Sequence, residues 1–326
     1  MKGFVVINPS SGTQTVQKTA LQIVHTLLLD DDAQGLQVSY THKKDDARRM
    51  CAALKPNEYD FVLAVGGDGT VNEAITGLYE SQSGIPLMIL PAGTTNDFAA
   101  ALGLPRTVEG VCQTIREGQS MAIDIGRFND TYFFNVAAGG LLSEVAHCVP
   151  SEMKTAFGRM AYLTEGGKKI LEKKFETTPL IFEIDGTEEQ HDVYFFLVAN
   201  STSVGGFSKI SPDAKINDGA FELLIVKKLD FFTALPAMMQ IQSGSHVNNE
   251  KLFEYRKVKR VRVRHAVEGK SFPLDYDGEF GGELPLDIEI IPNAVKLLIP
   301  VGSAKAEKLI ALSDENRIES DAIAGN

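Results

Sequence analysis

The sequence contains few cysteines, and their spacing does not suit a metal site. Its three cysteines, Cys51, Cys112 and Cys148, lie far apart. None belongs to a CxxC pair or to a cluster with histidine, as zinc sites require. An odd number of widely spaced cysteines also argues against a disulfide framework. Free thiols in a reducing cytoplasm fit this pattern best.

Long apolar runs are also missing. No run approaches the ~18 apolar residues of a helix that spans a bilayer. The apolar stretch near the start, 4–7, is too short for a signal peptide. We therefore expect a soluble, cytoplasmic protein, which can still touch a membrane surface transiently.

Positive charge is in deficit. The chain has 32 lysines and arginines against 43 acidic residues, a net charge of −11. Broad nucleic-acid binding depends on neutralising phosphates with basic side chains, so we expect no nucleic-acid partner. The same deficit argues against adhesion to anionic lipid by charge alone.

The 326 residues are enough for about two domains. In the first third, strands expected at 4–7, 36–40, 61–65 and 85–90 alternate with helical patterns. That alternation predicts a parallel sheet with right-handed crossovers. Strands are also expected at 121–127 and 131–138. From residue 179 onward alternating apolar stretches dominate, the last of them at 286–291 and 295–299, and they predict an antiparallel β-sandwich. We expect an α/β domain over 1–127, a β-rich domain over 128–301, and a C-terminal segment, 302–326, that packs back on the first domain.

Further helices are expected within and after these domains. Helical spacing appears at 141–147, 157–173, 231–241 and 303–312. The basic pairs at 168–169 and 173–174 lie in or just after the second of these. They suit either contact with an anionic membrane or an ordinary solvated helix face. The oligomeric state, including a homodimer, is left open.

Polar loops follow several strands of the expected parallel sheet, at 8–12, 41, 66–72 and 91–97. Ligands bind in such sheets beyond the carboxyl ends of the strands. Four polar loops at one edge predict a nucleotide cleft.

The loop after the third strand, Gly66-Gly67-Asp68-Gly69-Thr70, has the strongest signal. Its glycines permit positive φ and close approach of the backbone to a ligand. The helix that follows offers unpaired N–H groups to phosphate. Asp68 would repel phosphate unless a divalent cation lies between them. The alternative is a tight turn in which Asp68 only caps the helix.

Other acids suggest the chemistry. Asp68, Asp97 and Asp124 each follow a predicted strand or lie late in one, so they are candidates to converge on one Mg²⁺; three independent caps or surface acids are the alternative. Asp277 and Glu279 flank Gly278. They would face one cleft as acidic partner and general base, or else form a plain hairpin turn.

Four segments taken together resemble the diacylglycerol kinase catalytic family, in particular bacterial soluble lipid kinases. They are the stretch 66–73 (GGDGTVNE), the stretch 91–99 (PAGTTNDFA), the stretch 211–219 (SPDAKINDG) and the tripeptide 277–279 (DGE). The first is shared with NAD kinases and phosphofructokinase-like folds, whereas the four in this order are specific. The resemblance covers nearly the whole chain. It implies a three-layer α/β domain followed by a β-sandwich.

The resemblance also implies an activity and a set of site residues. The activity is ATP- and Mg²⁺-dependent phosphorylation of a lipid hydroxyl at a membrane surface, with diacylglycerol converted to phosphatidic acid in phospholipid and lipoteichoic-acid-linked recycling. Glu279 would be the proton acceptor, and Lys215, Asp218 and Ala220 would hold a structural Mg²⁺. The residues expected to contact ATP are Asn8, Pro9, Ser10, Ser11, Gly12, Thr41, Gly66, Gly67, Asp68, Gly69, Thr70, Val71, Asn72, Thr94 and Asn96.

The residues agree with this implication in one further respect. No G-x-x-x-x-G-K-[ST] motif occurs, so metal and backbone N–H groups must neutralise the triphosphate. Two rivals stay open. The first is an NAD kinase-like enzyme on the same scaffold, and the second is a nucleotide-binding regulator without turnover.

Overall fold

The computed structural model describes residues 1–11, 14–93, 96–140, 177–228, 231–267 and 271–310. Its N-terminal part is built on four parallel strands in the order β4-β3-β1-β2. Nearly every residue of β1, β3 and β4 is buried, as expected for strands covered on both faces. The strands are β1 (Lys2–Ile7), β2 (Gly35–Tyr40), β3 (Phe61–Gly66) and β4 (Leu87–Pro91).

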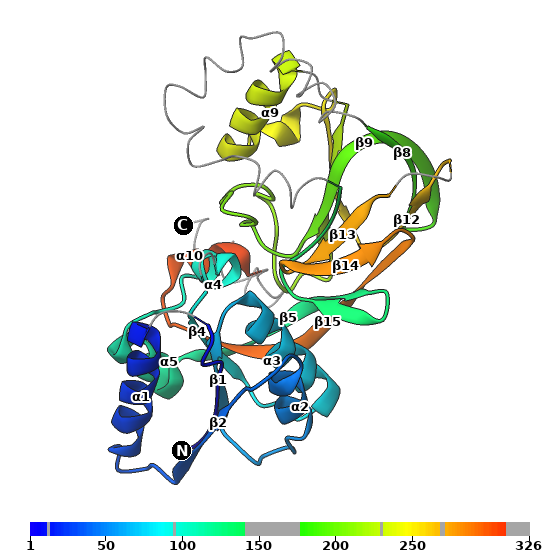
Figure 1. Cartoon of the computed structure of the whole chain (residues 1–326). Coiled ribbons are helices and arrows are strands. Elements are labelled where there is room, and N and C mark those ends of the chain that lie inside the picture. The colour runs from blue at the N-terminus through cyan, green and yellow to red at the C-terminus, as the bar shows by residue number, and fades with distance from the viewer. Residues whose placement is uncertain (12–13, 94–95, 141–176, 229–230, 268–270, 311–326) are drawn as a thin grey trace, which may run out of the picture.

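Helices cover both faces of this sheet (Figure 1). On one face α1 (Gln14–Leu28) and α5 (Val108–Glu117) bury apolar side chains against it. On the other face α2 (Asp46–Ala52), α3 (Asp68–Ser81) and α4 (Asp97–Leu102) do the same. The predicted three-layer α/β domain is confirmed.

The C-terminal part is an antiparallel β-domain, as predicted (Figure 1). Its strands enclose one apolar cluster, and α9 (Phe231–Ser243) packs on a second. A single 3₁₀ turn, Ser245–Asn248, follows α9. The strands are β6 (Thr131–Phe133), β7 (Val136–Gly140), β8 (Thr178–Ile184), β9 (Thr187–Ala199), β10 (Phe221–Lys227), β11 (Phe253–Val258), β12 (Arg260–His265), β13 (Pro273–Tyr276) and β14 (Glu279–Glu283).

Two long strands, β5 (Gln119–Phe128) and β15 (Leu286–Ile299), join the two parts into one continuous sheet. They pair with each other along most of their length, and β15 also pairs with β12 and β4. Its last residues lie in the N-terminal core rather than in the β-domain, because Val295 and Leu297 pack there. The two domains therefore share strands, because β15 lies within the range expected for the β-rich domain, 128–301, and yet ends in the N-terminal core.

The C-terminal helix α10 (Ala304–Leu309) contacts the first domain. Ala306 and Leu309 lie in the same core, and Ser303 donates a hydrogen bond to the carbonyl of Leu102. Within the described ranges, no helix combines the length and the apolar character that a membrane span needs. The helices expected at 141–147 and 157–173, the basic pairs of 168–174 and the residues after 310 lie outside the described residues.

Candidate active site

The loops after β1, β3 and β4 meet at one edge of the sheet, as the sequence predicted. The amide of Asn8 donates to the carbonyl of Val65, and the amide of Ala92 to that of Gly66, at 2.9 and 2.8 Å. A Cβ atom on Gly67 would lie 3.6 Å from Cα of Gly93. The backbones of these loops thus pack directly against each other. Gly12 and Thr94 lie outside the described residues.

The loop after β3 passes directly into the N-terminus of α3. Gly67 is the residue before the helix and provides no side-chain cap, and the helix begins at Asp68. The first N–H groups of a helix have no partner within it, so this end suits a phosphate group. None of the three glycines of this loop, Gly66, Gly67 and Gly69, has a positive φ. The prediction that they serve to permit positive φ is therefore wrong. Their absent side chains provide space instead.

Several residues predicted to contact ATP hold this edge together. Asn8 donates from Nδ2 to Oγ1 of Thr70 at 2.9 Å and accepts from the amide of Ser10. Asn96 donates to the carbonyl of Gly93 at 2.5 Å. Val71 is buried in the core, so only its backbone can face a ligand.

Thr41 follows β2 directly, at the same edge. Its amide donates to the carbonyl of Ile7 at 2.9 Å, and the residue is buried. The next loop is fixed by the carboxylate of Asp46, which accepts from the amides of His42 and Lys43 at 2.8 and 3.1 Å. These bonds hold the pKa of Asp46 below its usual value, the bond from His42 contributing most.

The β13–β14 hairpin from the C-terminal domain faces this edge. Its two turn residues, Asp277 (φ 49°) and Gly278 (φ 83°), are both left-handed, which is the geometry of a tight Asp-Gly hairpin. Asp277 is 7% exposed. Its carboxylate accepts four hydrogen bonds of 2.8–3.0 Å, from the side chain of Asn72 and the amides of Phe134, Asn135 and Val136.

Burial raises the pKa of Asp277 to about 7, against the opposing effect of its four donors. Asn72 also donates to the carbonyl of Tyr132 at 2.9 Å. Its side-chain amide therefore ties α3 to the β-domain. Asp277 and Asn72 form a buried link between the domains, and that link fixes the position of the adjacent Glu279.

Glu279 reaches the N-terminus of α3. A Cβ atom on Gly69 would lie 3.0 Å from Oε1 of Glu279, and the other oxygen, Oε2, lies 3.0 Å from Nζ of Lys44. The Glu279 side chain is 40% exposed, so a substrate can approach it. The structure thus brings the predicted base to the predicted phosphate-binding loop across 210 residues of sequence, from 69 to 279.

The structure does not bring Asp68, Asp97 and Asp124 together around one ion, contrary to the prediction. Among the described residues, no three His, Cys, Asp or Glu side chains are grouped so that they could hold a metal. Asp97 instead accepts from the amide of Gly206, at 3.2 and 3.3 Å. Asp124 lies within β5, is fully buried, and accepts from the amides of Gly219 and Asn293 at 2.8 Å. These two carboxylates bind backbone amides of the C-terminal domain.

The loop that contains Lys215, Asp218 and Ala220 lies beside β10. The Asp218 carboxylate pairs with Nζ of Lys257 at 2.5 Å and accepts from the amide of Ala220 at 3.1 Å. Lys215 donates from Nζ to the carbonyl of Lys308. A metal site in this loop stays a prediction, and an ammonium group already neutralises its carboxylate.

Sequence reasoning missed two residues of this edge. Glu73 accepts from the amides of Asp45 and Ala47 at 2.8 and 3.1 Å, so it caps the start of α2. Lys44 contacts Glu279. The available signals were the position of Glu73 in the 66–73 motif and the position of Lys44 three residues after Thr41.

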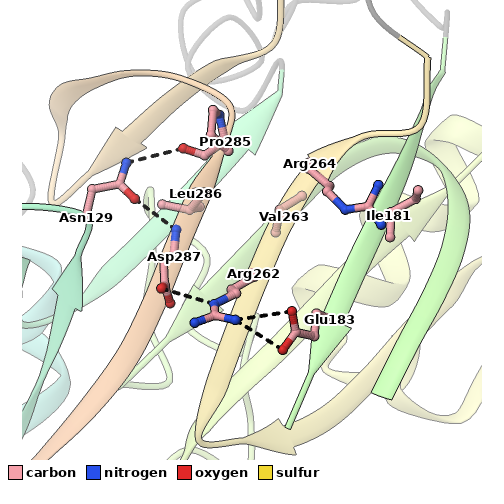
Figure 2. A pocket seen from close by; sticks show the side chains of 9 residues that line it. All are labelled: Asn129, Ile181, Glu183, Arg262, Val263, Arg264, Pro285, Leu286 and Asp287. Atoms are coloured by element: carbon pink, nitrogen blue, oxygen red, sulfur yellow. Dashed lines mark hydrogen bonds and ion pairs between the residues drawn. The ribbon is translucent and has the colours of Figure 1, made fainter. Parts of the chain in front are cut away.

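A separate depression of about 220 Å³ lies on the β-domain, between β8, β12 and β15 (Figure 2). Arg262 lies in it between Glu183 and Asp287 and bonds to both, at 3.3 and 3.1 Å. Asn129 in turn accepts from the amide of Asp287. These charges are paired with each other, and none of the predicted site residues lines the depression.

Family models match both parts of the chain. Residues 2–128 match the model of the diacylglycerol kinase catalytic domain, and residues 135–299 match that of the YegS C-terminal NAD kinase beta sandwich-like domain. A diacylglycerol kinase of Bacillus subtilis (strain 168) is 35% identical over 94% of this chain and 98% of its own length. The diacylglycerol kinase of Staphylococcus haemolyticus (strain JCSC1435) is 31% identical over 98% of this chain and 93% of its own.

A solved structure shares the fold. The crystal structure of a diacylglycerol kinase from Bacillus anthracis str. Sterne superposes with a TM-score of 0.68 over 93% of this chain and 98% of that chain. Its sequence identity is 19%, so this likeness supports the architecture alone.

Proposed function

The chain belongs to the diacylglycerol kinase family, and on that premise we propose that it transfers the γ-phosphoryl group of ATP to the free hydroxyl of diacylglycerol. The observation that carries the proposal is the position of Glu279. Its carboxylate lies at the N-terminus of α3, beside Gly69, where a phosphate group would bind. A carboxylate beside a phosphate site is unfavourable for simple nucleotide binding, but it is what transfer to an alcohol requires.

In the proposed reaction, Glu279 accepts the proton of the lipid hydroxyl as its oxygen attacks the γ-phosphorus. The new P–O bond forms while the bond from phosphorus to the bridging oxygen of ADP breaks. The N–H groups at the start of α3 face the phosphates and stabilise the charge that spreads over their oxygens. Asp277 holds the turn that carries Glu279 and acts as a positioning residue.

Magnesium fits one part of this site. Mg²⁺ binds through one or two carboxylates, retained waters and substrate phosphates. Asp68, as the first residue of α3, provides such a carboxylate at the phosphate loop. Bound there with ATP, the ion would neutralise part of the triphosphate charge. No step is assigned to the loop at Asp218, because Lys257 pairs with that carboxylate.

The lipid acceptor requires contact with a membrane surface, and the exposed Phe280 offers one apolar contact next to the base. Phe280 is 74% exposed, an unusual state for a large aromatic side chain. Adjacent residues of a strand point to opposite faces, so Phe280 points away from Glu279 and is available to acyl chains.

The proposal is tested with purified protein, labelled ATP and two acceptors, diacylglycerol in mixed micelles and NAD in solution. We expect labelled phosphatidic acid, formed at a rate that rises with the mole fraction of diacylglycerol. Labelled NADP without phosphatidic acid would establish the NAD kinase alternative. If the protein binds nucleotide but phosphorylates neither acceptor, the alternative of a non-catalytic nucleotide-binding regulator would be established.

A further inference from the structure

Lys44 and Glu279 form an ion pair across the two domains, between residues 235 positions apart in the chain. Lys44 lies in the loop between β2 and α2, and Glu279 begins β14. Their charged atoms are 3.0 Å apart, and the carboxylate raises the pKa of Lys44, which therefore stays protonated. The Lys44 ammonium is thus placed at the proposed site of proton transfer.

The backbone on both sides of Lys44 is held in place. The amide of Lys43 donates to Asp46, and the amide of Asp45 donates to Glu73 at 2.8 Å. Glu73 belongs to α3, one turn after Gly69. The loop is thereby anchored to the helix whose N-terminus faces Glu279, so the point from which the Lys44 side chain extends is fixed relative to the phosphate loop.

Stability does not account for this arrangement. The two side chains are 68% and 40% exposed, and pairs so exposed contribute little to the free energy of folding. Position offers a better reason. Glu279 has a long flexible side chain, and the Lys44 contact to Oε2 directs the other oxygen, Oε1, toward Gly69.

We propose that Lys44 is a positioning residue for phosphoryl transfer, which holds the Glu279 carboxylate over the N-terminus of α3 so that it meets the acceptor hydroxyl. This inference rests on the proposed function. It predicts that Lys44 acts through Glu279 and contributes nothing once that carboxylate is gone. An ammonium that bound ATP directly would act in the presence or absence of Glu279.

The test is a double-mutant cycle with Lys44→Met, Glu279→Gln and the combined variant, measured for kcat and for the KM of ATP. Lys44→Met keeps the length of the side chain without its charge. We expect it to lower kcat by about 10- to 100-fold with little change in the KM of ATP, because a base displaced by about an ångström loses that much. In the Glu279→Gln background the same change should have no further effect.

Two further variants separate position from general charge. Lys44→Arg, which keeps the ion pair, should restore most of kcat. Lys43→Met removes a neighbouring exposed charge from the same loop and should leave kcat unchanged. If Lys44→Met does not fold, Lys44→Gln replaces it in the cycle.

The outcomes are distinct. A Lys44 effect that persists in the Glu279→Gln background, or that raises the KM of ATP instead of lowering kcat, would overturn the positioning role. Absence of wild-type turnover on diacylglycerol would instead refute the proposed function. Normal wild-type turnover with an unaffected Lys44→Met refutes only this inference.

Discussion

The turn after β3 and the turn between β13 and β14 both combine glycine with acidic residues, yet their glycines differ in physical purpose. Gly66 has an ordinary φ, and a Cβ atom there would lie 2.5 Å from Oγ1 of Thr70. Gly278 has a φ of 83°, and a Cβ atom there would meet nothing within 4 Å. The first turn needs glycine for space, whereas the second needs it for conformation.

The acidic residues of the two turns differ as well. Asp277 is buried and accepts four hydrogen bonds, whereas Glu279, two residues later, is partly exposed and reaches the other domain. One carboxylate holds the hairpin in place and the other is available for chemistry. Spacing alone does not distinguish them, because both flank the same glycine.

The largest expected effect is on turnover. Glu279→Gln keeps size and hydrogen bonding but removes basicity, so kcat should fall by about 10²–10⁴-fold with the KM of ATP little changed. Steady-state kinetics at saturating lipid measures this. Glu283→Gln, on the same hairpin, is the control and should retain wild-type kcat. A near-wild-type kcat in Glu279→Gln would show that Glu279 is not the general base.

Asp277→Asn should act mainly on stability. The substitution replaces one carboxylate oxygen, which accepts hydrogen bonds, with an NH₂ group, which can only donate them. That NH₂ group would face N–H donors, so the free energy of unfolding should fall by about 2–4 kcal/mol. Urea denaturation measures this. Asp275→Asn is the comparison and should cost less, since Asp275 accepts one long bond of 3.3 Å from Gly278. Equal losses in the two variants would contradict a special structural role for Asp277.

Substitution of Gly66 should be limited by space. Gly66→Ala should lower the free energy of unfolding by about 1–3 kcal/mol, because the added carbon displaces Thr70 and the loop. Gly66→Asn should be worse than alanine, since its side chain is larger. Thermal denaturation and the KM of ATP measure both effects. An asparagine variant at least as stable as the alanine variant would show that the loop has room to spare.

At Gly278 the order should be reversed. Gly278→Ala should cost about 1 kcal/mol, the penalty for a left-handed residue with a Cβ atom. Gly278→Asn should cost less than alanine, because asparagine tolerates that conformation. The two Gly278 variants are measured together with the two Gly66 variants. If alanine and asparagine rank in the same order of stability at both positions, the distinction between the two turns is wrong.

The smallest expected effect is on lipid use. Phe280→Ser should raise the half-saturating mole fraction of diacylglycerol by roughly two- to five-fold, since only part of its apolar surface would leave water in the complex. The KM of ATP should not change. Val301→Ser, equally exposed but next to α10, is the control. An equal shift in both variants would mean that the half-saturating mole fraction depends on the loss of any exposed apolar side chain and not on Phe280 in particular.

Much of the molecule could be predicted from local sequence patterns. The four parallel strands follow from short apolar runs that each lead into a polar loop, and the phosphate loop follows from its glycines and the helix after it. The dipeptide Asp277-Gly278 predicts a hairpin turn, but its flanking strands could not be predicted because β14 contains two glycines. The stretches 121–127, 286–291 and 295–299 predict strands, but local patterns do not show that the last two form one strand, β15, which pairs with β5 across both domains.

The sequence by itself determined the chemistry that is present: an acid among phosphate-binding glycines, a second acidic turn far along the chain, and no Walker lysine. The tertiary structure decided which acids are available. It placed Asp97 and Asp124 on backbone amides of the other domain and buried Asp277. It also brought Lys44 to Glu279. A carboxylate's use depends on which donors surround it in three dimensions, and those donors come from segments up to 235 residues away, which no local pattern can specify.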